Sequence, residues 1–185
     1  PAFVSTLAGG VAASTAASEP LQGFSSSFFS CVGGLAFSPD RGRLYVGSQA
    51  SGAVYQIRFL DFGSQLVHVL CTLPAPPQAM CCDRRGWLFV ASANKVHKVD
   101  FNTGEVRFVA GGGPGGNDAS GESAGFSAIN ALVIDGNDDL IVVDQHCIRK
   151  VTLRRGQVVT VCGSSSEPGH VLMDSELVLA SVDQL

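Results

Sequence analysis

The sequence has few charged residues and no long apolar run. Of its 185 residues, 15% are charged, and the formal net charge at pH 7 is -4. This acidic balance gives no electrostatic basis for binding nucleic acid or an anionic membrane. No apolar stretch approaches the length that a bilayer span requires. Hydrophobic residues nevertheless make up 45% of the chain, so we expect part of its surface to be covered by another protein surface.

The six cysteines are not spaced as in a zinc-binding motif. Most of them fall within hydrophobic patterns typical of strands, where a free cysteine behaves as a small buried hydrophobic residue. We therefore expect core thiols that hold no metal. This usage favours a reducing, intracellular compartment, because cysteines in oxidising compartments are commonly paired in disulfides.

The glycine-rich segment 111–126 lacks the features of a phosphate-binding loop. Neither a helix start nor a Lys-Ser or Lys-Thr pair follows it, and no nucleophile elbow occurs elsewhere in the chain. We interpret the segment as a flexible connection anchored by Ala124 and Phe126. A version with looser spacing before its alanine returns after Gly163. There, four residues take the places of Gly116, Asp118, Ala124 and Phe126, namely Gly169, Asp174, Ala180 and Val182.

What the sequence does contain is a unit of four short strands, most clearly in segment 130–163. Its first three strands are aliphatic runs of suitable length, and Asp135-Gly136-Asn137 is a strong turn signal between the first two. A sheet of this size has two apolar faces and cannot bury both alone. It therefore needs a neighbour on each side, as a repeated unit would supply.

The unit does repeat, with the four strand types in the same order and a period of roughly 40–52 residues. Both features are typical of the blades of a β-propeller. The sequence thus predicts one all-β domain, 1–185, that forms a β-propeller segment of three four-stranded antiparallel blades, with the second strand of each blade at its centre. The predicted parts are an outer strand at 3–9, blades at 33–72, 78–112 and 129–163, and the start of a further blade at 164–185.

The third blade carries a more specific pattern. It combines Ala-x-Phe in the preceding loop, Asp-Gly in the first turn, and a motif made of Asp144, His146, Ile148, Arg149 and Lys150. This pattern resembles the NHL repeat, although two residues are missing between Asp144 and His146 and the other blades match only in their apolar positions. The resemblance implies a β-propeller, usually six-bladed. We expect Asp144 and His146 to be structural residues whose side chains bond within the blade.

Some propeller enzymes similar to the NHL family hold a metal on the propeller axis, with side chains from the starts of the innermost strands. In this sequence those positions are Gly33, Gln78 and Asn130. Glycine contributes no ligand, and two amides make a poor metal site without carboxylates or imidazoles. We therefore predict that Gln78 and Asn130 line the axis, and we expect no catalytic residue, metal or cofactor in this segment.

Three functions remain open. A non-catalytic protein-interaction scaffold is favoured, because no catalytic motif is visible. The alternative is a hydrolase or lyase propeller whose axial metal site lies mostly outside this segment. Carboxylates or imidazoles that converge at the axis would favour the enzyme. The third function, an RNA-binding platform, requires a basic face, and the acidic balance of the chain speaks against it.

Three blades form an arc, so both ends would expose apolar sheet faces. We expect a protein partner to cover these ends, most simply the remaining blades of a longer six-bladed propeller. The alternative is a homodimer in which two arcs complete a ring by two-fold symmetry.

Overall fold

The computed structural model describes residues 7, 29–50 and 52–164. Over these residues the chain forms β-strands joined by turns, with one short 3₁₀ helix, η2 (Gly121–Ser123), and no α-helix. No helix within the described ranges is long and apolar enough to cross a membrane. The predicted outer strand at 3–9 and most of the predicted further blade at 164–185 lie outside these ranges.

The strands form three antiparallel sheets. Sheet one contains, in spatial order, β1 (Ser30–Phe37), β2 (Arg43–Gln49), β3 (Tyr55–Asp61) and β4 (Leu66–Leu73). Sheet two contains β5 (Pro77–Cys82), β6 (Trp87–Ser92), β7 (Lys95–Asp100) and β8 (Val106–Gly111). Sheet three contains β10 (Ile129–Ile134), β11 (Leu140–Asp144), β12 (Cys147–Thr152), β13 (Gln157–Gly163) and β9 (Ala119–Ser120).

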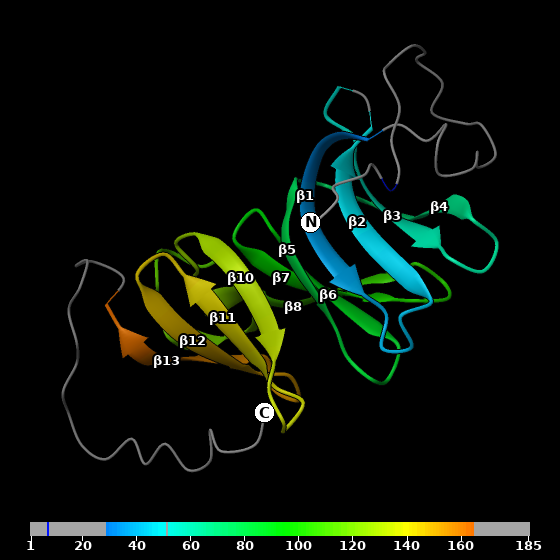
Figure 1. Ribbon diagram of the computed structural model, residues 1–185. Coiled ribbons are helices and arrows are strands. Elements are labelled where there is room, and N and C mark those ends of the chain that lie inside the picture. Colours follow the sequence, from blue (N-terminus) through cyan, green and yellow to red (C-terminus); the bar gives the residue numbers. More distant parts are fainter. Residues whose placement is uncertain (1–6, 8–28, 51, 165–185) are drawn as a thin grey trace, which may run out of the picture.

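Sheet two lies between the other two sheets, and its first strand β5 lies beside both β1 and β10 (Figure 1). The three innermost strands are thus the first strands of their sheets, as in a β-propeller. The predicted all-β, propeller-like fold class is confirmed. Sheet three differs from the prediction in having five strands, because the glycine-rich segment contributes the short strand β9 at its outer edge.

Aspartates fix the turns that connect the strands. In sheet three, Asp135 Oδ1 accepts hydrogen bonds from the backbone N–H groups of Asn137 (2.8 Å) and Asp139 (2.9 Å). In sheet two, Asp83 Oδ1 accepts from the N–H groups of Arg85 (2.9 Å) and Trp87 (2.8 Å) in the same way. Such side-chain bonds replace backbone partners in a tight reversal. They explain why the chain turns at the same point of sheets two and three.

The hydrophobic core lies between the sheets. Between sheets one and two, Tyr45 and Ile57 pack with Leu88 and Val90, and all four are fully buried. Between sheets two and three, Phe89 and other residues of sheet two pack with residues of sheet three such as Leu140 and Val142. The second strand of a sheet therefore contributes side chains to the core on each face that another sheet covers.

Glycines allow sheets one and two to approach closely near their innermost strands. A Cβ atom on Gly33 would collide with the carbonyl oxygen of Pro77, and one on Gly47 would lie 2.5 Å from Pro77 Cγ. Any larger residue at either position would push β5 away from sheet one. The sequence pattern alone does not show this requirement.

The strand register predicts opposite effects at two adjacent valines of β11. Val142 is fully buried against sheet two, whereas Val143 points to the opposite face and is 39% exposed. Val142→Asp should unfold the protein, because an unpaired charge buried in an apolar core costs several kcal/mol. Val143→Asp should leave a folded protein with a thermal midpoint close to that of the wild type. Equal midpoints for the two variants, measured by circular dichroism, would contradict this register.

Candidate functional site

The innermost strands of sheets two and three each carry a β-bulge near their start. The strand pairing skips Gln78 between Pro77 and Ala79, and it skips Asn130 between Ile129 and Ala131. A bulge leaves one residue unpaired and changes the direction of its side chain. Gln78 and Asn130 are both exposed, and they lie on the neighbouring strands β5 and β10. Their role in lining an axis remains a prediction.

The residues that the structure describes contain no group of three or more His, Cys, Asp or Glu side chains able to hold a metal ion. The acidic and basic side chains of sheet three instead pair with one another. Two such clusters, around Arg149 and around Lys150, include three of the five predicted motif residues, namely Asp144, Arg149 and Lys150. The other two motif residues are exposed, Ile148 on a face of the sheet and His146 in a turn.

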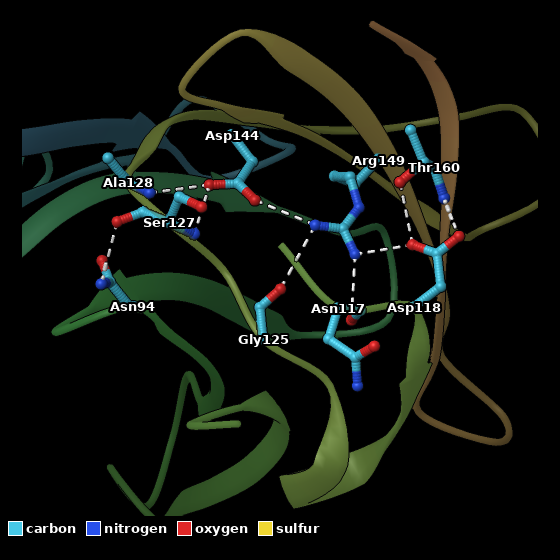
Figure 2. Close-up of polar contacts among 9 residues, drawn as sticks. All are labelled: Asn94, Asn117, Asp118, Gly125, Ser127, Ala128, Asp144, Arg149 and Thr160. Carbon is cyan, nitrogen blue, oxygen red and sulfur yellow. Dashed lines mark hydrogen bonds and ion pairs between the residues drawn. The ribbon is translucent and has the colours of Figure 1, made fainter. Parts of the chain in front are cut away.

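Arg149 is the centre of the first cluster (Figure 2), and its side chain is 0% exposed. Its Nη1 donates to Asp144 Oδ2 at 3.0 Å and to the carbonyl oxygen of Gly125 at 3.2 Å. Its Nη2 donates to Asp118 Oδ1 at 2.8 Å and to the carbonyl oxygen of Asn117 at 3.2 Å. The guanidinium also lies 5.6 Å from the ring centroid of Phe126. A buried arginine is stable in such a place because carboxylates and carbonyls surround it.

Both carboxylates of this cluster bind backbone groups as well. Asp144 Oδ1 accepts from the N–H groups of Ser127 (2.8 Å) and Ala128 (2.7 Å), just before β10. Asp118 accepts from the N–H group and the hydroxyl of Thr160 on β13, at 2.9 Å and 2.8 Å. The cluster therefore ties the glycine-rich segment to both edges of sheet three. The predicted anchors Ala124 and Phe126 are buried, so the segment is held along much of its length.

The structure assigns different roles to Asp144 and His146. Asp144 is fully buried and bonds within its sheet and to the preceding loop, as expected. His146, by contrast, is exposed in the turn between β11 and β12, and no hydrogen bond of its side chain is found in the described part of the chain. The bonding role expected of His146 belongs to Arg149. One sequence signal pointed to it: a buried strand position that holds arginine requires acidic partners.

Lys150 is the centre of the second cluster, on the opposite face of β12. Its ammonium group lies 3.0 Å from Asp135 Oδ2 and 3.3 Å from Asp139 Oδ2. Burial raises the pKa of Asp135, but hydrogen bonds from the Asp139 N–H group, the Lys150 ammonium and the Asn137 N–H group outweigh it and lower the pKa. The bond to Asp135 raises the pKa of Lys150 in turn. The lysine charge is thus neutralised locally by the turn between β10 and β11.

The face of sheet three that points away from sheet two is largely apolar, and we call it the outward face. Two rows of residues cross it, each following the strand pairing from β10 to β13. The first row consists of Ala131, Val143, Ile148 and Cys162. The second row consists of Val133, Ile141, Lys150 and Val159. Val133 is 56% exposed, Val143 39% and Ile148 38%, so the outward face carries large exposed hydrophobic side chains.

The cysteine thiols differ in their surroundings. Burial raises the pKa of Cys71 to about 11 and that of Cys81 and Cys82 to about 12. Burial also raises the pKa of Cys147. These four cysteines and the exposed Cys162 are all free. Cys147 on β12 is buried as predicted, Cys71, Cys81 and Cys82 of sheets one and two are half-buried, and Cys162 lies exposed on the outward face.

No family model matches the chain. No curated protein matches it either. Solved structures do match. One is an auxiliary nutrient binding protein from Bacteroides ovatus, at 21% identity and a TM-score of 0.58 over 71% of this chain and 36% of that one. Another is its counterpart from Bacteroides thetaiotaomicron, at 23% identity and 0.55 over 70% and 35%.

A gluconolactonase from Xanthomonas campestris also matches, at 19% identity and a TM-score of 0.50 over 72% of this chain and 39% of that one. The chain therefore spans 35% to 39% of the length of these three structures. At such identities the likeness concerns the fold alone. The chain therefore has a β-propeller-like fold.

Removing Asp144 should be far more costly than removing His146. Asp144→Ala leaves the buried Arg149 without its buried carboxylate partner and frees two backbone N–H groups, which should lower the free energy of unfolding by about 3–5 kcal/mol. His146→Ala removes an exposed side chain and should change it by less than about 0.5 kcal/mol. Urea denaturation of the two variants measures both values. A comparable loss in His146→Ala would restore the bonding role that the sequence predicted for it.

The Lys150 cluster should make stability depend on acidic pH. The pKa of Asp135 in the folded state lies below its ordinary value of 3.8, so its contribution is complete above that pH and is lost as the pH falls through the folded-state pKa. Asp135→Asn should therefore flatten the decline of unfolding free energy on acidification. Lys150→Met should flatten the same decline to a smaller extent, because the lysine is one of several groups that lower the pKa of Asp135. An Asp135→Asn profile as steep as that of the wild type would show that other carboxylates account for the decline.

Proposed function

We propose that this chain is a segment of an NHL-like propeller that serves as a non-catalytic scaffold, binding other protein surfaces through its exposed sheet faces. The observation that supports this function is the outward face of sheet three. Exposed hydrophobic side chains that gather on one face commonly mark a site of protein association. The partner surface could belong to the remaining blades of a longer six-bladed propeller or to another protein, including a second copy of this chain.

The charge distribution of the outward face supports the same function. Its one cation, Lys150, is neutralised by Asp135 and Asp139 from the adjoining turn. A partner can therefore cover the face with an apolar surface and need not supply a carboxylate. This matters because an unpaired charge buried in an interface lowers the binding free energy far more than a solvent-exposed charge at its rim raises it.

The structural comparisons are compatible with a binding role. Two of the similar structures are auxiliary nutrient binding proteins, and a propeller segment of this kind can serve binding as well as catalysis. The comparisons indicate the fold. The scaffold function is our inference from the exposed face.

A hydrolase or lyase propeller remains the second candidate, and one observation favours it. The bulges in β5 and β10 leave the amide side chains of Gln78 and Asn130 exposed on neighbouring innermost strands, where they could help to hold an axial group. One similar structure is a gluconolactonase. This candidate requires that a protein containing this segment hydrolyse lactones, and that Asn130→Ala abolish the hydrolysis without unfolding the protein.

The scaffold function predicts association through the second row of the outward face. Light scattering should give a mass above the 19.2 kDa of one chain, since a second copy is the protein surface available in a pure sample. Val133→Glu combined with Val159→Glu should reduce the mass to that of a monomer. Val69→Glu is the matched control, because Val69 is 49% exposed on β4 and lies outside the outward face. A wild-type chain that stays monomeric at all concentrations, as both variants do, would contradict the proposal.

A further inference from the structure

We propose that Gln65 determines which sheet can dock on the outward face of sheet three. In the packing that joins the sheets of this chain, Gln65 prevents sheet one of a second copy from docking there. The face is left to a sheet that carries glycine at the equivalent position. This role rests on the proposed scaffold function, because it concerns the partner of that same face. It goes further, since it excludes one partner and states what the docking sheet must carry.

The turn between the third and fourth strands has the same form in all three sheets, and we call it the third turn. In each sheet the fifth residue of this turn donates its N–H group to the carbonyl oxygen of the first residue. The bonds run from Gln65 to Asp61 (2.8 Å), from Gly104 to Asp100 (3.0 Å) and from Gly156 to Thr152 (2.9 Å). The fifth residue has a left-handed φ in every case, at +58°, +70° and +61° respectively. Gln65 is thus the counterpart of Gly104 and Gly156.

The fourth strand of each sheet carries a β-bulge at the same place. The strand pairing skips Leu70 in β4, Val109 in β8 and Val161 in β13. A bulged residue is left out of the pairing with the neighbouring strand, so its backbone groups are available for other contacts. In β4 and β8 the carbonyl oxygen of the bulged residue lies against the third turn of the following sheet. The same contact therefore occurs at both interfaces between sheets.

Both of these contacts require glycine in the third turn. A Cβ atom on Gly104 would collide with the carbonyl oxygen of Leu70, and one on Gly156 would lie 2.8 Å from the carbonyl oxygen of Val109. In each case the obstacle is backbone in a packed interface, which cannot move aside as the end of a flexible side chain can. A larger residue at either position would therefore push the two sheets apart. The left-handed φ alone does not demand glycine, since Gln65 adopts it as well.

Sheet three presents one half of this contact. Val161 is its bulged residue, and among the residues that the structure describes no further sheet follows to bring a third turn against it. A sheet that packed on the outward face as sheet three packs on sheet two would bring its third turn to the carbonyl group of Val161. Sheet one of a second copy would bring Gln65, whose Cβ atom has no space beside a carbonyl oxygen. A ring of two copies is therefore excluded in this packing, and a second copy can associate only in another arrangement, such as outward face against outward face.

The requirement for glycine can be measured inside one chain. Gly156→Ala should lower the thermal midpoint by at least about 5 °C more than Gly52→Ala does, because only the first variant places a methyl group against a carbonyl oxygen. Gly52 is the matched control, since its φ is +56° and a Cβ atom there would meet nothing within 4 Å. Equal losses by circular dichroism would show that backbone conformation alone accounts for the glycine, and they would overturn the role of Gln65.

The choice of partner can be measured with two versions of the full 185-residue chain. The receiving chain is the wild type, labelled at its α-amino group. The probe chain carries Val143→Asp, which disables its own outward face, together with Gln65, Gln65→Ala or Gln65→Gly. Fluorescence anisotropy should show that the Gln65→Gly probe binds the receiving chain at least about tenfold more tightly than the Gln65 probe, because the overpacking is then removed. The Gln65→Ala probe keeps the Cβ atom and should bind as weakly as the Gln65 probe.

Equal binding by the three probe chains, or no binding by any of them, would overturn the role of Gln65. The scaffold function is tested separately, because its light-scattering assay uses the wild-type chain and charges at Val133 and Val159. A wild type that associates through those two valines, while the three probe chains bind equally, would contradict only the choice made by Gln65. The Gly156→Ala variant is likewise independent of association, since it reports packing within a single chain.

Discussion

The need to cover both faces of each four-stranded sheet is the constraint on which this structure depends. Burial of apolar side chains contributes about 25 cal/mol for each Å² removed from water, and a single sheet can bury only what a neighbour covers. Sheet two has neighbours on both sides, and Leu88, Val90, Ala91 and Val96 are fully buried as a result. Sheet three has the same arrangement of side chains but a neighbour on one side only. The larger exposure of sheet three follows from this missing neighbour.

A second constraint arises because loops must connect one sheet to the next across this core. The Arg149 cluster meets it by placing a buried charge where loop carbonyls and carboxylates converge. Removing such a charge from water is costly, so the arrangement is stable only while every partner stays in place. The short strand β9 follows from this requirement, since Asp118 must reach Thr160 on β13 and thereby brings Ala119 beside Val158.

Sequence alone was sufficient for the features that depend on local patterns. Aliphatic runs, turn signals and the repeated order of four strand types predicted the all-β fold, and Ala124 and Phe126 were predicted to anchor the glycine-rich segment. It was not sufficient where residues far apart in the chain meet. Arg149 binds Asp118 across 31 positions, and no periodicity encodes that pairing. The exposure of His146 was missed because the residue lies in the turn between β11 and β12 and not on a strand. The bulges at Gln78 and Asn130 were missed because a bulge depends on strand pairing.

Lys98 of sheet two and Lys150 of sheet three show how one position of the repeat can serve two environments. In sheet two, the ammonium group of Lys98 lies 4.6 Å from the ring centroid of Trp87, at the edge of the interface with sheet three. In sheet three, the ammonium group of Lys150 is held by Asp135 and Asp139 of the adjoining turn. An aromatic ring offsets the charge of an ammonium group only in part, whereas a carboxylate pairs with it directly. The outward face of sheet three is therefore better prepared for an apolar cover than the face of sheet two that is already covered. The ion pairs of Lys150 form within sheet three and its own turn, so they do not depend on a bound partner.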